Sequence, residues 1–338
     1  MRALLRNCWY MGAWAHEVTA MPLSRRLLGV GTLFFRGEDT KLVALRDRCP
    51  HRFAPLSAGK VVGNTIQCPY HGLVFDASGQ CISAPLEERA PRSVRVQNFP
   101  VVERDNIIWF WPGDPQAADP SLIPDFAYLV DPAYKHVFGM TQVKAHYELE
   151  TDNLMDLSHV DMLHPAFAGV LSPRSQFKAT REGNRVQANW FSSNATNPTS
   201  MEYGPFPTGG GLIDQWLEMR WDPPASMYLE VAVSKAGETR EKGYAMPGVH
   251  ILTPETDHST LYFWAGSLRV EDQVPLDEFR ESFIQTFEHE DKPMLEQVAA
   301  GMDGETDLLA MKPLLLRSDA GSVLARRVLA ELIAMEQG

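Results

Sequence analysis

The sequence lacks several features that would each assign it to a broad class of proteins. Four cysteines in 338 residues are too few for a disulfide framework. No apolar run reaches the roughly 18 residues that span a bilayer, and Arg6 and Asn7 interrupt the apolar start where a signal peptide would continue. The formal net charge is −12 with no lysine- or arginine-rich run, which argues against nucleic-acid and anionic-membrane partners. Together, these absences predict a cytoplasmic protein.

Turn chemistry and hydrophobic patterning divide the chain into two predicted domains. Residues 1–112 consist of short apolar runs separated by polar turns, which indicates a small antiparallel β domain. The stretch 112–126 contains four prolines and is typical of a boundary or an ordered linker. The second predicted domain therefore comprises residues 113–338. The length of the chain is consistent with two hydrophobic cores.

The second predicted domain mixes helical and β-strand patterns. Residues 143–164 and 275–299 are expected to be helical, the latter with an amphipathic pattern. Several β-prone segments between 174 and 268 would suit a larger antiparallel sheet. The last segment, 319–337, carries one apolar stripe, which is typical of a helix that docks on a core. The predicted fold class is thus α+β, with an antiparallel β domain first.

Two cysteine–histidine pairs mark the first domain. One pair has the pattern C-x-H, the other has C-x-x-H, and sixteen residues separate them. They are Cys49 with His51 and Cys68 with His71. Structural zinc sites usually pair like ligands along the chain, whereas each pair here contains one ligand of each type. A [2Fe–2S] cluster with two cysteines on one iron and two histidines on the other requires this division.

The strings CPHR and CPYHG resemble the signature of the Rieske iron–sulfur family. The resemblance implies one [2Fe–2S] cluster for one-electron transfer, bound by the two pairs at the tips of two loops; a zinc site is the alternative. Pro50 and Pro69 would stiffen these loops, and Gly72 would permit a positive φ or a close backbone approach. Cys8 and Cys81 stand outside the pattern and are expected to be buried.

A second pair of histidines, His159 and His164, lies in the string LETDNLMDLSHVDMLHPA. Positions five apart lie on different sides of a regular helix. Joint metal binding therefore requires a helix that is irregular or ends between them, as Pro165 suggests. Two histidines and one distant carboxylate form the facial triad of non-haem iron(II) oxygenases. Taken alone, the pair is more typical of structural histidines, but the Rieske motif upstream favours an iron site.

The string DNLMDLSHVDMLH resembles the iron-binding motif of Rieske non-haem iron oxygenases, D/N-x-x-D-x-x-H-x₄-H. The matching residues are Asn153, Asp156, His159 and His164. The resemblance implies that the two histidines bind a mononuclear non-haem iron(II), and that Asn153 and Asp156 are catalytic candidates. It further implies that Asp156 bridges an iron-binding histidine to a cluster-binding histidine of the next subunit in a homotrimer, which gives electrons a path between subunits.

The third iron ligand is expected on the late helix, within the string FEHEDKPMLEQ. Three acids compete there, Glu288, Glu290 and Asp291. The pattern of the family, an acid a few residues before an M-[LI]-E string, favours Asp291. His289, which lies among these acids, is expected at the surface.

The resemblance extends over the whole chain. The strings RNCWY, FPVVERDNIIWFWPGDP, HILTPET and DAGSVLARRVL are similar to the oxygenase component of the group that includes vanillate O-demethylase, dicamba O-demethylase and toluenesulfonate methyl-monooxygenase. The group implies a helix-grip catalytic domain with an apolar pocket over the iron. His250 matches a histidine that contacts the substrate carboxylate. Leu229 and Ser282 replace other pocket positions, and the unusual loop 192–212 is expected to shape the pocket or its lid.

The expected function is that of a terminal oxygenase. The resemblance implies that it uses O₂ to hydroxylate a methyl group of a small aromatic acid, foremost a methoxybenzoate, which then releases formaldehyde and a phenol. Because the chain lacks a G-x-G-x-x-G fingerprint, a separate flavin and iron–sulfur reductase, with or without a ferredoxin, must oxidise NAD(P)H. Benzylic or ring hydroxylation and N-demethylation are alternatives on the same scaffold. A Rieske electron carrier is the alternative outside enzymes, and the motif Asn153–His164 argues against it.

Overall fold

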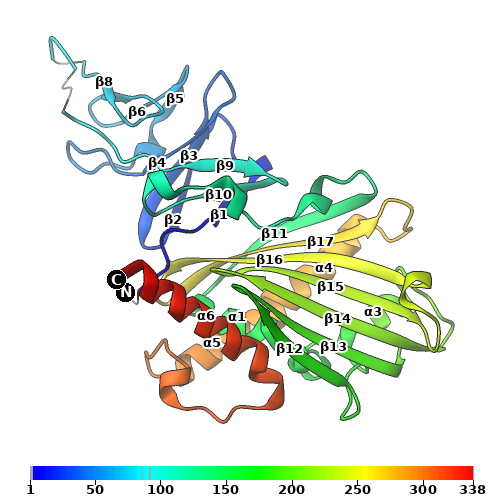
Figure 1. Cartoon of the computed structure of the whole chain (residues 1–338). Coiled ribbons are helices and arrows are strands. Elements are labelled where there is room, and N and C mark those ends of the chain that lie inside the picture. Colours follow the sequence, from blue (N-terminus) through cyan, green and yellow to red (C-terminus); the bar gives the residue numbers. More distant parts are fainter. Residues whose placement is uncertain (1–2, 86, 91–92, 338) are drawn as a thin grey trace. The chain divides into compact units, whose positions relative to one another are not determined.

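The structure is a computed structural model that describes residues 3–85, 87–90 and 93–337. These residues form two compact units, which can be followed by colour in Figure 1. Leu4–Asp125 make up one unit, and Phe126 begins the main part of the other. Each unit contains its own hydrophobic core.

The N-terminal unit is built from three small antiparallel sheets. Their strand orders are β1-β10-β9, β2-β3-β4 and β5-β6-β7-β8. The strands are β1 (Tyr10–Trp14), β2 (Leu23–Leu27), β3 (Val30–Arg36), β4 (Leu42–Arg46), β5 (Lys60–Val62), β6 (Thr65–Gln67), β7 (Val74–Phe75), β8 (Cys81–Ser83), β9 (Val101–Arg104) and β10 (Ile107–Phe110). The antiparallel β domain predicted for this part of the chain is confirmed.

The proline-rich stretch after β10 packs on this same unit. The indole N–H of Trp9 donates to the carbonyl of Asp119 at 2.8 Å, and the backbone N–H of Asp114 donates to Asn7 Oδ1 at 2.8 Å. Because of such contacts, the compact units divide after Asp125. The stretch is an ordered linker, and the boundary predicted from the sequence lies at its start.

The C-terminal unit is built around one seven-stranded antiparallel sheet, in the order β11-β17-β16-β15-β14-β13-β12. The strands are β11 (Tyr134–Val143), β12 (Gln176–Glu182), β13 (Arg185–Thr196), β14 (Leu212–Asp222), β15 (Ser226–Lys235), β16 (Tyr244–Thr256) and β17 (Ser259–Arg269). In β14, every second side chain from Ile213 to Trp221 is buried. This alternation is expected for a strand with one face against a covered core.

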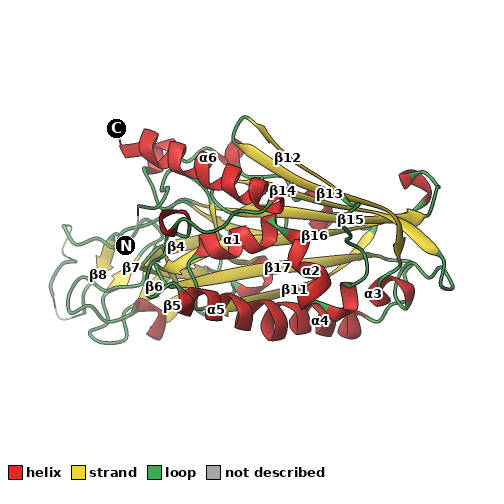
Figure 2. Ribbon diagram, turned by 90° about the horizontal axis from the view of Figure 1, so that it is seen from below, coloured by secondary structure: helices red, strands yellow, loops and turns green. Residues whose placement is uncertain are grey.

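Helices cover one face of this sheet. Figure 2 shows α1, α4, α5 and α6 gathered along the same side of the strands. The helices are α1 (Tyr147–Met155), α2 (Val160–Leu163), α3 (Thr199–Glu202), α4 (Leu276–Ile284), α5 (Lys292–Gly301) and α6 (Ala320–Gln337). A π-helical segment, Gln285–Asp291, joins α4 to α5. The predicted α+β class and the two predicted amphipathic helices are confirmed.

The predicted helix 143–164 is irregular, as joint metal binding by the two histidines requires, and its last piece, α2, ends between them at Leu163. α1 ends where Asp156 adopts φ −113° and ψ 86°. A single 3-10 turn then leads into the short α2, and His164 is again non-helical before Pro165. This break brings the rings of His159 and His164 to a centroid distance of 5.2 Å.

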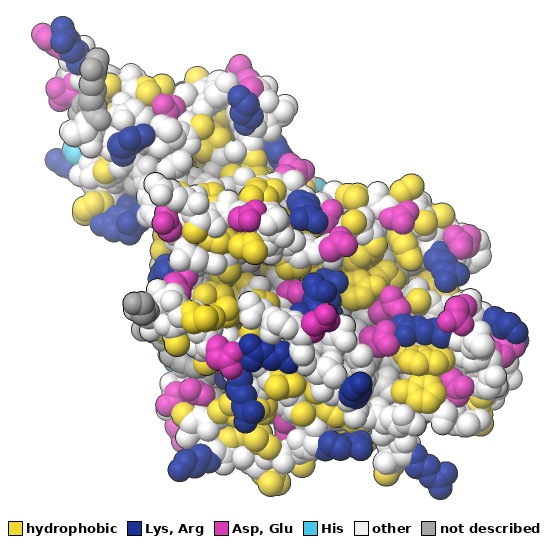
Figure 3. Space-filling model, viewed as in Figure 1, with side chains coloured by type: hydrophobic (Ala, Val, Ile, Leu, Met, Phe, Trp, Pro, Cys, Tyr) yellow, Lys and Arg dark blue, Asp and Glu magenta, His cyan; other side chains and the backbone are white. Residues whose placement is uncertain are grey.

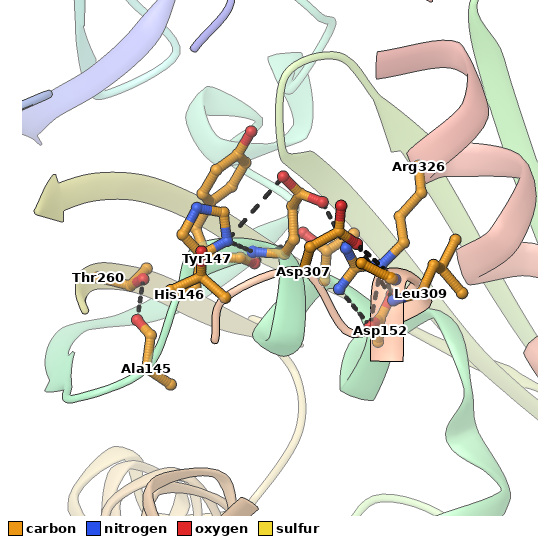
Figure 4. A network of polar contacts seen from close by, with 12 residues as sticks. Ala145, His146, Tyr147, Asp152, Thr260, Asp307, Leu309 and Arg326 are labelled. Atoms are coloured by element: carbon orange, nitrogen blue, oxygen red, sulfur yellow. Dashed lines mark hydrogen bonds and ion pairs between the residues drawn. The ribbon is translucent and has the colours of Figure 1, made fainter. Parts of the chain in front are cut away.

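The C-terminal helix α6 docks on α1 through a buried ion-pair network, which Figure 4 shows from close by. Arg326 points from α6 to the carboxylate of Asp152 and donates from Nη2 to Oδ2 at 2.7 Å. Its Nη1 also donates to Glu148. The Arg326 side chain is only 5% exposed, so the network fixes α6 against the helix that precedes the candidate iron-binding residues.

Charged side chains of both signs are mixed at the surface. On the face drawn in Figure 3, lysine and arginine side chains lie among aspartate and glutamate side chains. This distribution agrees with an acidic chain that has no basic run. Within the part of the chain that the structure describes, no helix is both long and apolar enough to cross a bilayer.

Candidate metal centres and substrate cavity

Two loops of the N-terminal unit share one backbone arrangement. The N–H of Cys49 donates to the carbonyl five residues later, and the carbonyl of Cys49 accepts from the N–H of Phe53. Cys68 repeats both bonds, with Gly72 in the place of Phe53. Phe53 and Gly72 both have positive φ, 62° and 73°, as predicted for Gly72. The two loops therefore present their cysteines in the same way.

This arrangement separates the thiols from the imidazoles. Cys49 and Cys68 are 1% and 2% exposed and belong to the core of the unit. The rings of His51 and His71 lie nearer the surface, with centroids 4.4 Å apart. Burial raises the pKa of the Cys49 thiol to about 11, and the neighbouring Cys68 adds to this effect. Two buried thiolates need a bound cation, so the site suits an iron–sulfur cluster with histidines on its outer side.

Three further metal-binding side chains converge in the C-terminal unit. His159, His164 and Asp291 each offer a ligand atom, and these atoms lie within 4.8 Å of one another. Asp291 Oδ1 lies 3.6 Å from His159 Nε2 and 3.3 Å from His164 Nε2. His164 and Asp291 are 3% and 5% exposed. Two imidazoles and one carboxylate suit non-haem iron and leave coordination positions open.

Each of these imidazoles is held through its other nitrogen. His159 Nδ1 lies 2.7 Å from the backbone carbonyl of Asp156, and His164 Nδ1 lies 2.7 Å from Glu290 Oε2. Such acceptors keep the ring proton on Nδ1 and leave Nε2 for a metal. Burial lowers the pKa of His159. Burial has the same tendency at His164, but Asp291 and Glu290 outweigh it, so the pKa of His164 is raised.

A π-helical segment presents Asp291 to the histidines. It interrupts a helical run that otherwise continues from Leu276 to Gly301. From α1, Asn153 Nδ2 donates to Asp291 Oδ1 at 3.2 Å and orients the carboxylate. π-Helical turns are rare and frequently occur at functional sites. The sequence carries no signal for this turn.

The acids that compete for the third ligand position have different surroundings. Asp291 faces the Nε2 atoms of both histidines. Glu290 lies behind His164, at its Nδ1. Glu288 pairs instead with Lys292 at 3.0 Å, and His289 is exposed, as expected. The position of Asp291 therefore agrees with the prediction that it is the third ligand.

The backbone carbonyl of Asp156, rather than the expected carboxylate, contacts His159. The carboxylate accepts a hydrogen bond from the N–H of Ser158 at 3.0 Å and begins the 3-10 turn before α2. It is only partly buried. The bridge that this carboxylate is predicted to make to another subunit stays a prediction.

A cavity of about 330 Å³ adjoins the three candidate iron ligands. Its size lies in the range of small-molecule sites. Most of its wall is apolar, with side chains from the α2 region, β14–β16 and α4, among them Leu157, Val160, Leu217, Val231, Phe283 and Phe287. Residues of the segment 192–212, including Met201 and Tyr203, line it as expected, but the segment contains the end of β13 and α3 and is not a plain loop.

His250, the predicted substrate-binding residue, lies in the wall of this cavity. It stands on β16, is 4% exposed, and its Nδ1 lies 2.6 Å from the hydroxyl of Tyr262. Phe287 packs edge-on against its ring at 5.7 Å. Burial lowers the pKa of His250 to about 4, so the ring is neutral at pH 7. Tyr262 occupies one ring nitrogen, and Nε2 is left for a ligand.

Two known protein families match the sequence. The Rieske [2Fe-2S] domain matches residues 8–100, and the vanillate O-demethylase oxygenase C-terminal domain matches residues 143–335. The chain belongs to the vanillate O-demethylase oxygenase family. Its N-terminal unit contains the Rieske domain, and the family that the sequence motifs predicted is confirmed.

Characterised relatives and solved structures agree with this membership. The oxygenase component of dicamba O-demethylase from Stenotrophomonas maltophilia is 37% identical over 337 residues, 98% of each chain. The vanillate O-demethylase oxygenase subunit of Pseudomonas sp. (strain ATCC 19151) is 36% identical, over 90% of this chain and 94% of its own. A crystal structure of dicamba monooxygenase bound to dicamba matches with a TM-score of 0.90 at 36% identity, covering 99% of both chains.

Sequence reasoning missed two functional details of this region. The support of His164 by Glu290 cannot be read from the sequence, because neighbouring acids on a helix are told apart only by the direction of each side chain. Gln215 also lines the cavity. A signal for it does exist, since Gln215 falls on the buried face of β14 in the alternation Ile213, Gln215, Leu217. A polar residue at such a position is a candidate for ligand contact.

Proposed function

We propose that this chain is the terminal oxygenase component of an aromatic O-demethylase. The observation that carries the proposal is the convergence of His159, His164 and Asp291 at an apolar cavity. Metal ligands that open onto such a cavity suit the oxidation of an apolar group, for example a methyl group. A pure electron carrier has no use for an enclosed cavity beside an open metal site.

Two metal groups are required for this function, and the donor sets suit both. Cys49, His51, Cys68 and His71 would hold one [2Fe–2S] cluster, and His159, His164 and Asp291 would hold one mononuclear iron(II). Together these groups would supply the reduction and activation of O₂, with one oxygen atom going into a methyl C–H bond and the other leaving as water with electrons from a reductase and protons from solvent. A hydroxylated methoxy group then loses formaldehyde and leaves a phenol.

The remaining residues of the site orient the candidate metal ligands, exclude water and bind the substrate. Asn153 holds the Asp291 carboxylate, and Glu290 and the carbonyl of Asp156 keep protons on the Nδ1 atoms of the histidines. Phe283 and Phe287 cover the cavity from the helix side and keep water from the reacting methyl group. His250 offers Nε2 to a polar group of the substrate.

The proposed enzyme depends on other chains. A separate flavin and iron–sulfur reductase, with or without a ferredoxin, would supply electrons from NAD(P)H. A homotrimer, in which Asp156 accepts a hydrogen bond from a cluster-binding histidine of the next subunit, would carry electrons between subunits. The predicted location stays the cytoplasm.

A single turnover without a reductase tests the proposed reaction. The purified protein would be reduced with dithionite, freed of excess reductant, and exposed to O₂ with a set of methoxy-, methyl- and unsubstituted aromatic compounds, both acids and uncharged analogues. We expect formaldehyde and a phenol from methoxy compounds, in proportion to the reduced iron present. A His159→Ala variant serves as the control, since it should keep the cluster and form no product.

Other outcomes would assign a different reaction. A benzylic alcohol or a ring-hydroxylated product without formaldehyde would replace O-demethylation by one of the alternatives on the same scaffold. Oxidation of the cluster without any product, in protein that contains both metals, would contradict an oxygenase function for every compound in the set.

A further inference from the structure

The substrate cavity is poor in groups that could balance a negative charge. Among the described residues that line it, none is lysine or arginine. Outside the candidate iron ligands, its ionisable members are Asp161, Glu278, His250 and the largely exposed phenol of Tyr203. The carboxylate of Asp161 accepts from the N–H groups of Gly169 and Leu171, and Glu278 lies at the exposed start of α4. An anion bound in this cavity would therefore meet two carboxylates, which repel it, and one imidazole.

That imidazole is a poor partner for a buried carboxylate. His250 is held at Nδ1 by Tyr262, and burial lowers its pKa to about 4. Next to it, the wall continues with Gly248 and Leu229, which pair across β15 and β16. Neither provides a side-chain donor. A carboxylate in this place would give up its water shell for one neutral hydrogen bond, which is unfavourable.

Of the cavity's remaining polar side chains, Thr199, Ser282 and Thr286 each donate a hydroxyl to a backbone carbonyl. Ser200 on α3 and Gln215 on β14 each keep a buried oxygen without a partner among the described residues.

Gln215 shares the sheet wall with His250. His250 on β16 pairs with Met227 on β15, and Met227 pairs with Trp221 on β14. Along β14, Trp221 lies six residues from Gln215. Six residues of strand correspond to about 20 Å. The two polar positions thus lie at opposite ends of an apolar sheet wall, and the intervening rows contribute Leu217, Val231 and Leu229.

Gln215 is buried with an unused hydrogen-bonding atom. It is 4% exposed, and its Oε1 has no hydrogen-bond partner among the residues in the described ranges. Buried polar groups are hydrogen-bonded as a rule. A side-chain amide can both donate and accept, so Gln215 suits an uncharged polar group such as an amide, a ketone or a hydroxyl.

We propose that the substrate is an uncharged, elongated aromatic ether whose reacting methyl lies at the candidate iron ligands and whose far polar group hydrogen-bonds to Gln215. This inference rests on the proposed function, because it takes the methyl group as the end that lies at the metal. It differs from the expected aromatic acid in charge and in length. The specificity of this chain then depends on Gln215 at one end and on an uncharged contact to His250 at the other.

Binding to the anaerobic holoenzyme, measured by calorimetry at pH 7, tests the charge of the substrate. The probes are two pairs that differ in one functional group: para-methoxyphenylbutanamide with para-methoxyphenylbutanoate, and ortho-methoxybenzamide with ortho-methoxybenzoate. We expect each amide to bind at least about tenfold more tightly than its acid, because the acid loses hydration without gaining a cationic partner. Equal or tighter binding of either acid would overturn the inference, as would failure of both amides to bind.

Substitution of Gln215 tests the far contact. Gln215→Leu should weaken binding of para-methoxyphenylbutanamide about tenfold and leave binding of the shorter ortho-methoxybenzamide unchanged. Gln187→Leu, on the exposed side of the neighbouring strand, is the matched control and should change neither. A variant that binds the long amide as the native protein does, or that weakens both amides by the same factor, would refute the role of Gln215.

The same complexes separate this inference from the proposed reaction. A reduced complex with the long amide, exposed to O₂, should release formaldehyde. Tight binding of the amide without formaldehyde would contradict O-demethylation while the substrate class stands. Formaldehyde from both members of each pair, with equal affinities for amide and acid, would support the reaction and refute the substrate class.

Discussion

Glu290 and Asp291 are neighbours in the sequence, yet they contact opposite sides of His164. Glu290 Oε2 lies 2.7 Å from Nδ1, while Asp291 Oδ1 lies 3.3 Å from Nε2. Asp291 is thus a candidate iron ligand, whereas Glu290, one residue earlier, orients the ligand His164. Carboxylates behind a metal-binding imidazole fix its ring and raise its basicity.

Glu290→Gln should weaken iron binding in the C-terminal unit by about 10- to 100-fold, because the imidazole of His164 loses its charged acceptor. Competition with a chelator, followed by iron content, measures the change. Glu288→Gln removes the same charge at a position that pairs with Lys292 and should leave the affinity unchanged. Equal losses in the two variants would point to net charge rather than to the contact with His164.

Asp156→Asn tests the predicted bridge at the residue scale. The variant should retain cluster, iron and substrate binding, since the backbone carbonyl that holds His159 is unaffected. Turnover supported by a reductase should fall by about 100-fold if the carboxylate connects the two centres. Wild-type turnover would rule out the bridging role. Iron content and the visible spectrum of the cluster are the controls for intact sites.

Most of these site residues could be predicted from the sequence because the determining pattern is local. The spacing of Cys49 and His51 within one loop, and of His159 and His164 across a helix break, limits what each group can bind. Gln215 could not be assigned to the cavity in the same way. Its depth depends on which face of β14 the helices cover, and that is set by contacts between segments far apart in the chain.

At the scale of elements, one carboxylate organises the loop that follows α3. Glu202 accepts from the hydroxyl of Thr208 at 2.6 Å and from the N–H groups of Thr208, Gly209 and Gly210. Asn197 Nδ2 donates to it at 2.6 Å as well. The bonds to Thr208 are the main cause that lowers the pKa of Glu202 to about 2. Since α3 lines the cavity, this carboxylate also fixes part of the cavity wall.

The direction in which the stability of this loop depends on pH follows from the lowered pKa of Glu202. The folded loop keeps the full gain from the ionised carboxylate at every pH above the usual value of 4.5 and loses it progressively as pH falls from 4.5 through about 2. Protection of residues 203–211 against hydrogen exchange, corrected for intrinsic rates, should therefore be constant from pH 7 to pH 5. Glu202→Gln should lose much of this protection at pH 7, whereas Glu182→Gln, an exposed control, should not.

The network of α6 predicts a second effect at this scale. Arg326→Leu would leave Asp152 and Glu148 buried without their cation, which costs about 3–5 kcal/mol. Urea unfolding followed by tryptophan fluorescence should show this loss. Burial raises the pKa of Asp152 even beside Arg326, so protonation should reduce the loss as pH falls below 7.

The neighbouring Arg327 gives a matched control, because it carries the same charge on the exposed side of α6. Arg327→Leu should change the free energy of unfolding by less than about 0.5 kcal/mol. If both variants lost stability equally, the effect would come from the charge of the helix rather than from the buried network.

For the whole molecule, the proposed transfer of electrons between subunits can be tested by mixing. A Cys68→Ser chain would lack the cluster and a His159→Ala chain would lack the iron, so each is expected to be inactive alone. Mixed trimers, purified through two different tags, should regain activity, because an intact cluster of one subunit then faces an intact iron of the next. Inactive mixed oligomers would place the transfer within one chain.

The architecture of the whole chain was largely predictable, and the reason is physical. Alternation in strands such as β14 and the apolar stripe of α6 record which faces are buried. The predicted helix of 275–299 is present, but its π-helical interior is not encoded in that stripe. Buried pairs such as Arg326 with Asp152 join segments far apart in the chain, and no local pattern reports them.

The π-helical segment Gln285–Asp291 makes the chemistry depend on chain length. It holds one residue more than the same stretch of α-helix would need. Deleting one residue between α4 and Asp291 would allow regular α-helical bonds to form. The helices α4 and α5 would keep their amphipathic faces, but the widened turn that presents Asp291 to the histidines would be lost. A single-codon deletion should therefore yield a folded protein without its third iron ligand, so selection for activity and selection for folding would oppose each other at this one position.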